Sequence, residues 1–115
     1  MIERIDATEN TTRAVIRDGL IYFGGHVAYG KDITEQTQNL TKRYDELFEK
    51  FGTDKYHLLS ATVYIRDIKL RDEMNAVWYN WIPDGCAPIR VCVEVGLPDD
   101  FLVEVSVIAE LKENK

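Results

Sequence analysis

The chain has few cysteines, no strongly basic segment and no long apolar run, and each shortage excludes a class of protein. Cys86 and Cys92 are its two cysteines, too few for a disulfide scaffold and without the CxxC spacing of a zinc site. No apolar run approaches the ~20 residues of a membrane-spanning helix. The first ten residues lack the apolar segment of a secretory signal. We therefore expect a cytoplasmic protein with reduced thiols and no membrane association.

Positive charge is also in short supply. Fourteen basic residues against twenty acidic ones leave a formal net charge of −6. A surface of that sign repels phosphate backbones unless a local basic patch overrides it. The basic residues are scattered rather than clustered with aromatic residues, so we expect no nucleic-acid partner.

The remaining composition is that of an ordinary globular domain. The 115 residues are 45% hydrophobic and 30% charged, a balance that supports folding rather than disorder. A chain of this length buries about two-thirds of its surface on folding and needs no disulfide or metal to do so. We expect one domain spanning residues 1–115.

Two segments have the apolar spacing of amphipathic helices. The first runs from about Ile33 to Phe51, with a capping box at Asp32 and a terminating glycine at Gly52. The second runs from about Ile68 to Trp81 and ends before Pro83 and Gly85. Their apolar faces are expected to form the core: Leu40, Tyr44, Leu47, Phe48, Phe51, Leu70, Met74, Val77, Trp78 and Trp81.

The strands alternate between apolar and polar positions over residues 59–65, 89–95 and 103–111. The last two are joined by turn-forming residues and are predicted to pair as a hairpin. A second hairpin is predicted around Asp18-Gly19, after a possible short strand at 2–5. The order β-β-β-α-β-α-β-β predicts a two-layer α+β domain, with a mixed sheet and two helices on one face.

Two helices leave one face of such a sheet uncovered. We expect the valine-rich positions and Leu59 to face the helices, and a mixed set to remain outside: Ser60, Thr62, Tyr64, Arg90, Cys92, Glu94, Ser106 and Ile108. This set is too apolar for a fully wet surface, which favours burial against other copies of the chain. The alternative is a solvated antiparallel face.

Arg90 is the residue most suggestive of a binding site. An arginine inside the strand at 89–95 is costly to bury without a partner, and its planar fork fits a carboxylate. Cys92 and Glu94 have the same parity, and Glu104 has it on the next strand. Two readings stay open: Arg90 binds a carboxylate ligand, or it forms a structural pair with Glu104 across the predicted hairpin.

The C-terminal third resembles a known family. The stretch APIRVCVEVGLPDDFLVEVSVIAEL at residues 87–111 resembles the signature of the YjgF/RidA family. The strand LIYFGG at 20–25, the helix that contains Gln36, the segment SATVYIRD at 60–67 and the pair Met74-Asn75 also match. The resemblance therefore covers nearly the whole chain.

This resemblance implies a fold, an assembly and an activity. The fold is the chorismate-mutase-like α+β domain, assembled as a homotrimer with ligand clefts between neighbouring subunits. The activity is hydrolysis of reactive 2-enamine and 2-imine acids, such as 2-aminoacrylate and 2-iminopropanoate, to 2-keto acids and ammonia. It needs no metal or organic cofactor, and the substrate is a small-molecule carboxylate.

The resemblance also implies roles for individual residues. Arg90 would hold the substrate carboxylate, and Glu104 would hold or activate the attacking water. Gly25 would offer its backbone N–H, Cys92 its backbone, and Asn75 would complete the binding site.

One position departs from the family's pattern. The well-characterised deaminases carry a tyrosine before the first long strand, where this chain has Thr11, and His26 replaces a residue that is often glutamine. This departure favours a second hypothesis, a non-catalytic trimer that binds small carboxylates such as 2-keto acids. A third, RNA-directed role is described for some relatives, and the net charge argues against it.

Overall fold

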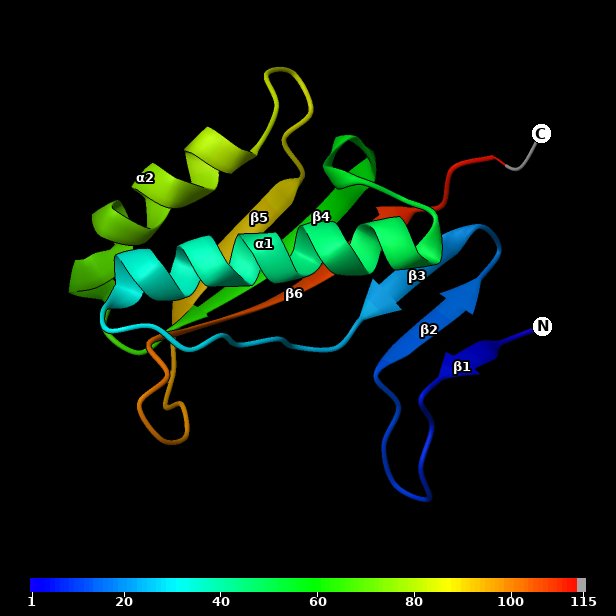
Figure 1. Ribbon diagram of the computed structural model, residues 1–115, viewed down its shortest axis with the longest axis horizontal. Helices are drawn as coiled ribbons and strands as arrows, with labels where there is room; N and C mark the ends of the chain where they lie inside the picture. Colours follow the sequence, from blue (N-terminus) through cyan, green and yellow to red (C-terminus); the bar gives the residue numbers. More distant parts are fainter. Residues whose placement is uncertain (114–115) are drawn as a thin grey trace.

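Two helices cover one face of a six-stranded mixed sheet, as the sequence predicts (Figure 1). The computed structural model describes residues 1–113. The strands are β1 (Glu3–Ile5), β2 (Ala14–Arg17), β3 (Leu20–Phe23), β4 (Leu58–Ile65), β5 (Ile89–Glu94) and β6 (Val103–Glu110). The helices are α1 (Ile33–Phe51) and α2 (Arg71–Trp81), with short 3-10 turns at Lys55–His57 and Ile68–Leu70. Neither helix, within residues 1–113, combines the length and apolar character that crossing a membrane requires.

Helix α1 begins and ends where its sequence predicts. The Asp32 side chain accepts a hydrogen bond from the Glu35 backbone N–H at 2.9 Å, which satisfies one of the free donors of the first turn. The Glu35 side chain accepts from the Lys31 N–H at 3.2 Å. Gly52 ends the helix with φ of 81°, a left-handed conformation that glycine adopts without strain. Helix α2 starts later than predicted, because residues 68–70 form a 3-10 turn capped by Asp67.

The core lies between α1 and the centre of the sheet. Tyr44 and Phe48 of α1 are fully buried, and they face strands whose inward residues are fully buried as well. The Tyr44 hydroxyl donates to the Val105 carbonyl at 2.6 Å, so α1 is also tied to β6 by a buried hydrogen bond. The β2–β3 hairpin, next to edge strand β1, turns through Asp18 and Gly19. Both residues have positive φ, and the turn lies where the sequence predicts it.

The predicted hairpin between the last two strands is wrong. The sheet order is β1-β2-β3-β6-β4-β5, so β4 lies between β5 and β6. Strand β5 pairs with β4 in parallel, and β6 pairs with β4 antiparallel. The turn-forming residues between β5 and β6 therefore lead across an intervening strand. Strands β4 and β5 are joined through α2 as a βαβ unit.

The prediction of which side of β5 faces the helices is also wrong. Arg90 pairs with Ala61 and Cys92 pairs with Val63, and both partners are core residues. Arg90, Cys92 and Glu94 therefore lie on the helix side of the sheet. The open side instead carries the apolar set, with Ile89 76% exposed and Val91 56% exposed.

A smaller correction concerns the start of β4. The pairing of β4 with β6 shifts between Leu58 and Ser60. This bulge buries Leu58 and leaves Leu59, which was expected in the core, exposed.

Candidate functional site

Arg90 lies on edge strand β5, beneath helix α2. Its guanidinium carbon is 5.7 Å from the ring centroid of Trp78 and 5.5 Å from that of Tyr79. Both contacts are within the range of cation–π attraction. Nevertheless the Nη1 atom is buried and has no hydrogen-bond partner. A buried donor without an acceptor is rare in a native protein and indicates a group that the isolated chain does not supply.

Asn75 carries a second unpaired polar atom on the same helix. Its Oδ1 is buried without a partner, and among residues 1–113 only this atom and Arg90 Nη1 are in that state. Asn75 precedes Trp78 and Tyr79 by three and four positions, so it occupies the same helix face one turn earlier. One unpaired atom is a donor and the other an acceptor. A ligand with both an acceptor and a donor would satisfy them together.

Cys92 follows on the same side of β5. It is a free thiol, partly buried against the core. On the side of Arg90 that faces the start of β5, a cleft of about 470 Å³ opens between the end of α2 and the loop that leads to β5. Its lining includes Trp78, Tyr79, Pro83, Pro88 and Arg90. Arg90, Asn75 and Cys92 are thus brought to one region of the molecule.

Gly25 and Glu104 form a separate group. Gly25 follows β3, and the next residue, His26, exchanges backbone hydrogen bonds with Val105 at 2.9 and 3.0 Å. A Cβ atom at Gly25 would overlap the carboxylate of Glu104. The Glu104 carboxylate therefore packs directly over the Gly25 backbone, a close approach that a glycine permits.

The two groups lie on opposite sides of the sheet. Glu104 and Val93 both pair with Tyr64, which places Glu104 on the open side, whereas Arg90 lies on the helix side. Strands β5 and β6 are separated by β4, hence by about 10 Å. The expected placement of Arg90 and Glu104 on facing strands of a hairpin is therefore wrong, and so is a structural ion pair between them.

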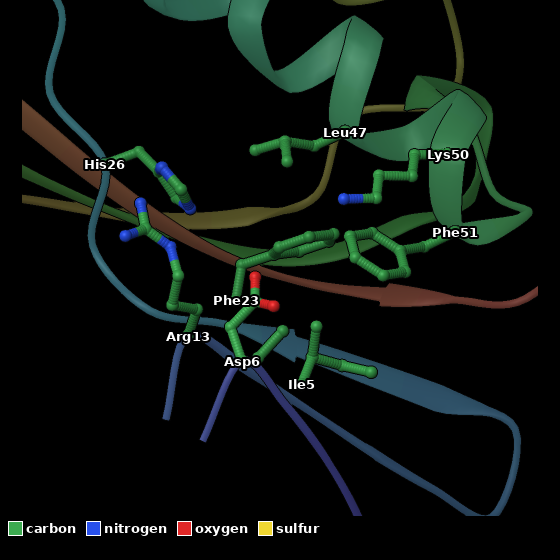
Figure 2. Close-up of a pocket in the computed structure, with 9 residues that line it drawn as sticks. Ile5, Asp6, Arg13, Phe23, His26, Leu47, Lys50 and Phe51 are labelled. Atoms are coloured by element: carbon green, nitrogen blue, oxygen red, sulfur yellow. The ribbon is translucent and has the colours of Figure 1, made fainter. Parts of the chain in front are cut away.

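His26 lies beside this second group in a small cavity. Figure 2 shows its ring next to Arg13 and toward Phe23, with Lys50 on the far side of the pocket. The cavity, which Asp6 also lines, has a volume of about 30 Å³. Burial, and then the positive charges of Arg43 and Arg13, lower the pKa of His26 from 6.5 to about 4. The imidazole is therefore neutral at pH 7. The cavity is large enough for about one or two water molecules and too small for an organic ligand.

The position expected to differ from the family's deaminases lies in the turn between β1 and β2. The Thr11 hydroxyl is 2.7 Å from the Thr8 hydroxyl, and both side chains are exposed. Within residues 1–113, no group of three or more His, Cys, Asp or Glu residues is arranged to hold a metal ion.

Sequence reasoning missed the aromatic surroundings of Arg90. It assigned Trp78 to the core, where it is buried, and it gave no role to Tyr79. The helical spacing marks Tyr79 as a surface position, and its contact with Arg90 depends on how α2 crosses β5. No sequence pattern predicts how α2 crosses β5.

Comparisons with known proteins agree with this fold. The family model described as Endoribonuclease L-PSP matches residues 1–111. A RutC family protein of Haemophilus ducreyi is 35% identical, covering 96% of this chain and 97% of its own. The RutC family protein YoaB of Escherichia coli is 34% identical, covering 94% and 96%.

Solved structures extend the likeness to three dimensions. A member of the YjgF protein family from Neisseria meningitidis superposes with a TM-score of 0.92 at 34% identity, covering 99% of this chain and 98% of its own. A putative translation initiation inhibitor from Salmonella typhimurium superposes with a TM-score of 0.85 at 32% identity, covering 96% and 97%. Together with the match of the family model, these relatives place the chain in the YjgF/RidA family.

Proposed function

We propose that the protein hydrolyses 2-imino acids, and their 2-enamine tautomers, to 2-keto acids and ammonia. The observation that carries the proposal is the pair of unpaired buried atoms, Arg90 Nη1 and Asn75 Oδ1. A 2-imino acid has a carboxylate that accepts from the first atom and an N–H that donates to the second. 2-Amino acids and 2-hydroxy acids offer the same pairing, and the resemblance to the family selects the imino acids among them.

Arg90 orients the substrate. Its fork binds the carboxylate through charge-assisted hydrogen bonds, which are about twice as strong as neutral ones. Fixing the carboxylate and the nitrogen restricts rotation of the C1–C2 bond and presents one face of C2 for attack. The resemblance to the family assigns the backbone of Cys92 and the N–H of Gly25 to contacts with the same ligand.

Glu104 activates the water. Its carboxylate removes a proton from the water while the water oxygen forms a bond to C2, the C=N electron pair moves to nitrogen, and the nitrogen takes up a proton to give a neutral carbinolamine. The carbinolamine collapses when the hydroxyl loses its proton to the base and the amine gains one: the C=O bond forms, the C–N bond breaks, and ammonia leaves with the electron pair of that bond. An imine is already electrophilic, so general-base help of roughly 10²–10⁴-fold suffices.

This chemistry needs two copies of the chain. Arg90 and Glu104 lie on opposite sides of one sheet, so the Glu104 that serves a substrate on Arg90 comes from a neighbour. The exposed apolar side of β5, with Ile89, Val91 and Val93, supplies a surface for that neighbour. The resemblance to the family implies a homotrimer with the clefts between subunits, and this arrangement agrees with it.

The experiment generates an imine with an amino-acid oxidase and lets semicarbazide compete for it. The protein should suppress semicarbazone formation, and Arg90→Ala should lose nearly all of that effect because the carboxylate anchor is gone. Arg17→Ala is the matched control, since Arg17 is exposed on the β2–β3 hairpin. Wild-type activity in Arg90→Ala, with both variants folded, would overturn the proposal.

A second candidate function is binding without catalysis. The observation that favours it is Thr11, which lacks the ring and phenol of the tyrosine that the family's well-characterised deaminases carry. Calorimetric titration with 2-ketobutyrate separates the two functions. Binding that depends on Arg90, with no suppression of semicarbazone formation, would favour the binding module.

The names of some relatives point to RNA instead. One structure is of a putative translation initiation inhibitor, and the family model is described as an endoribonuclease. The net charge of −6 weakens binding to a phosphate backbone. A small carboxylate on Arg90 is therefore the better-supported ligand.

A further inference from the structure

We infer that the site prefers 2-imino acids with an aromatic or bulky apolar side chain over the alanine-derived acid. This inference rests on the proposed function, because it concerns the substrate class of the Arg90 site. The observation behind it is the cleft beside Arg90, which a substrate carboxylate and imine alone would not fill. At about 470 Å³, the cleft lies within the ~300–1,000 Å³ of pockets that enclose small organic ligands.

The walls of the cleft combine apolar side chains with nearly as much polar surface. Two aromatic rings, Trp78 and Tyr79, form one side, and Ile82, Pro83, Ala87 and Pro88 contribute aliphatic surface. Apart from Arg90, the charged residue in the lining is Asp84, which is exposed. Flat rings and proline edges favour an aromatic guest through offset or edge-to-face contacts. The substrate carboxylate pairs with the charge of Arg90, so the aromatic side chain of the substrate does not lie next to an unpaired cation.

The order of groups along α2 gives the substrate its direction. Asn75 comes first, the two rings in contact with Arg90 follow one turn later, and Ile82 lies just after the helix ends. With the carboxylate on Arg90 and the nitrogen directed to Asn75, the third substituent of C2 points the other way. That substituent is the side chain, and it enters the cleft between Tyr79 and Pro88.

The test compares substrates that differ only in this substituent. Imines are generated from alanine, leucine, phenylalanine and lysine, and kcat/KM is measured for each. We expect the phenylalanine-derived imine to exceed the alanine-derived one by about tenfold or more, the usual gain from filling an apolar subsite. The leucine-derived imine should fall between them.

Tyr79→Ala probes the wall directly. Tyr79 is 64% exposed, so its removal should leave the fold intact, whereas Trp78 is buried and unsuitable. The ratio of kcat/KM for the phenylalanine- and alanine-derived imines should fall by about threefold or more. Tyr79→Phe should keep the ratio. Tyr56→Ala, an exposed tyrosine outside the cleft lining, is the matched control and should keep it too.

Three results would overturn the inference. These are equal kcat/KM for the alanine- and phenylalanine-derived imines, a preference for the lysine-derived imine, and an equal loss on all imines in Tyr79→Ala. The last result would mean that Tyr79 only positions Arg90. Failure of the proposed function is distinguishable, because no imine would then be hydrolysed. In that case the affinities of phenylpyruvate and pyruvate still test the cleft, and tighter binding of phenylpyruvate would support it.

Discussion

Arg90 is held in a state that the isolated chain does not satisfy. Leaving a buried donor unpaired costs about 1–3 kcal/mol, and contact with two aromatic rings offsets about 0.5–2 kcal/mol of such a cost. The same applies to Asn75, which lacks the rings. Side chains kept in this state at one place are typical of a preorganised binding site, where the ligand supplies the missing partners.

At Gly25, the absence of a side chain has a direct consequence for Glu104. In Gly25→Ala, the new methyl group displaces the end of the Glu104 side chain, which is flexible and can move. The fold should therefore survive while imine hydrolysis falls by about 10- to 100-fold, since the base is misplaced. Gly96→Ala is the control, because nothing lies within 4 Å of a Cβ there. Full activity in Gly25→Ala would contradict the role given to Glu104.

His26 makes the stability of the protein depend on pH. Its pKa is about 4 in the fold and 6.5 as the ordinary value, so the unfolded chain binds more protons between these values. The free energy of unfolding should fall as pH decreases through that window, by about 1–2 kcal/mol between pH 7 and 5. Urea denaturation at fixed protein concentration measures it, and His26→Gln should lose less stability over the same interval.

Asp54 affects the free energy of unfolding only at lower pH, so its contribution does not overlap that of His26. Burial raises the pKa of Asp54, but its hydrogen bond and charge interaction with His57 outweigh this and lower it below the ordinary value. The stability that Asp54 contributes is therefore lost only at still lower pH. An unchanged loss between pH 7 and 5 in His26→Gln would show that another residue titrates there.

At the scale of the elements, capping and turn residues predicted correctly where helix α1 ends and where the β2–β3 hairpin turns. Asp32 and Gly52 delimit α1 because a side-chain acceptor and a left-handed residue act within one turn. The Asp18-Gly19 pair closes the β2–β3 hairpin for the same reason. The turn residues between β5 and β6 have similar chemistry, yet β4 lies between these strands. Strand order depends on contacts far apart in the sequence, so the turn alone could not reveal it.

The orientation of β5 was mispredicted for a physical reason. Its alternation separates Ile89, Val91 and Val93 from Arg90 and Cys92, but alternation does not say which set faces the helices. Apolar residues face the core in a monomer. A strand at an interface between copies can instead direct its apolar set outward, which is how we interpret β5. The family resemblance predicted Arg90 and Asn75 as site residues, whereas their unpaired atoms become visible only in the fold.

This interpretation of β5 predicts how the assembly responds to a charge. Val91 is exposed in the isolated chain, so Val91→Asp should leave the fold of a protomer intact. In an apolar interface the unpaired carboxylate is strongly unfavourable, and the oligomer should dissociate and lose imine hydrolysis. Analytical ultracentrifugation measures the mass, with Tyr56→Asp as the control at an exposed apolar residue outside β5. An oligomer of unchanged size in Val91→Asp would place the interface elsewhere.

At the scale of the whole molecule, the proposed mechanism gives each chain two halves of a site. The Arg90 half lies on the helix side of the sheet edge, and the Glu104 half lies on the open side beside Gly25. In the proposed cyclic oligomer, the first half of each chain would meet the second half of its neighbour through one repeated contact. The sequence predicted an oligomer from the uncovered face, and this stays a prediction. The proposal that the two halves come from different subunits required the strand order, which the sequence did not reveal.

Mixed oligomers test this central claim most directly. Arg90→Ala and Glu104→Gln are each expected to be inactive when assembled alone. Co-expressed with different tags and purified through both, they form oligomers in which some interfaces join an intact Arg90 to an intact Glu104. In a cyclic trimer that holds both variants, one of the three sites joins an intact Arg90 to an intact Glu104, so the mixture should recover about a third of wild-type imine hydrolysis. Mixed oligomers of the correct size with no activity above that of the separate variants would contradict a site shared between subunits.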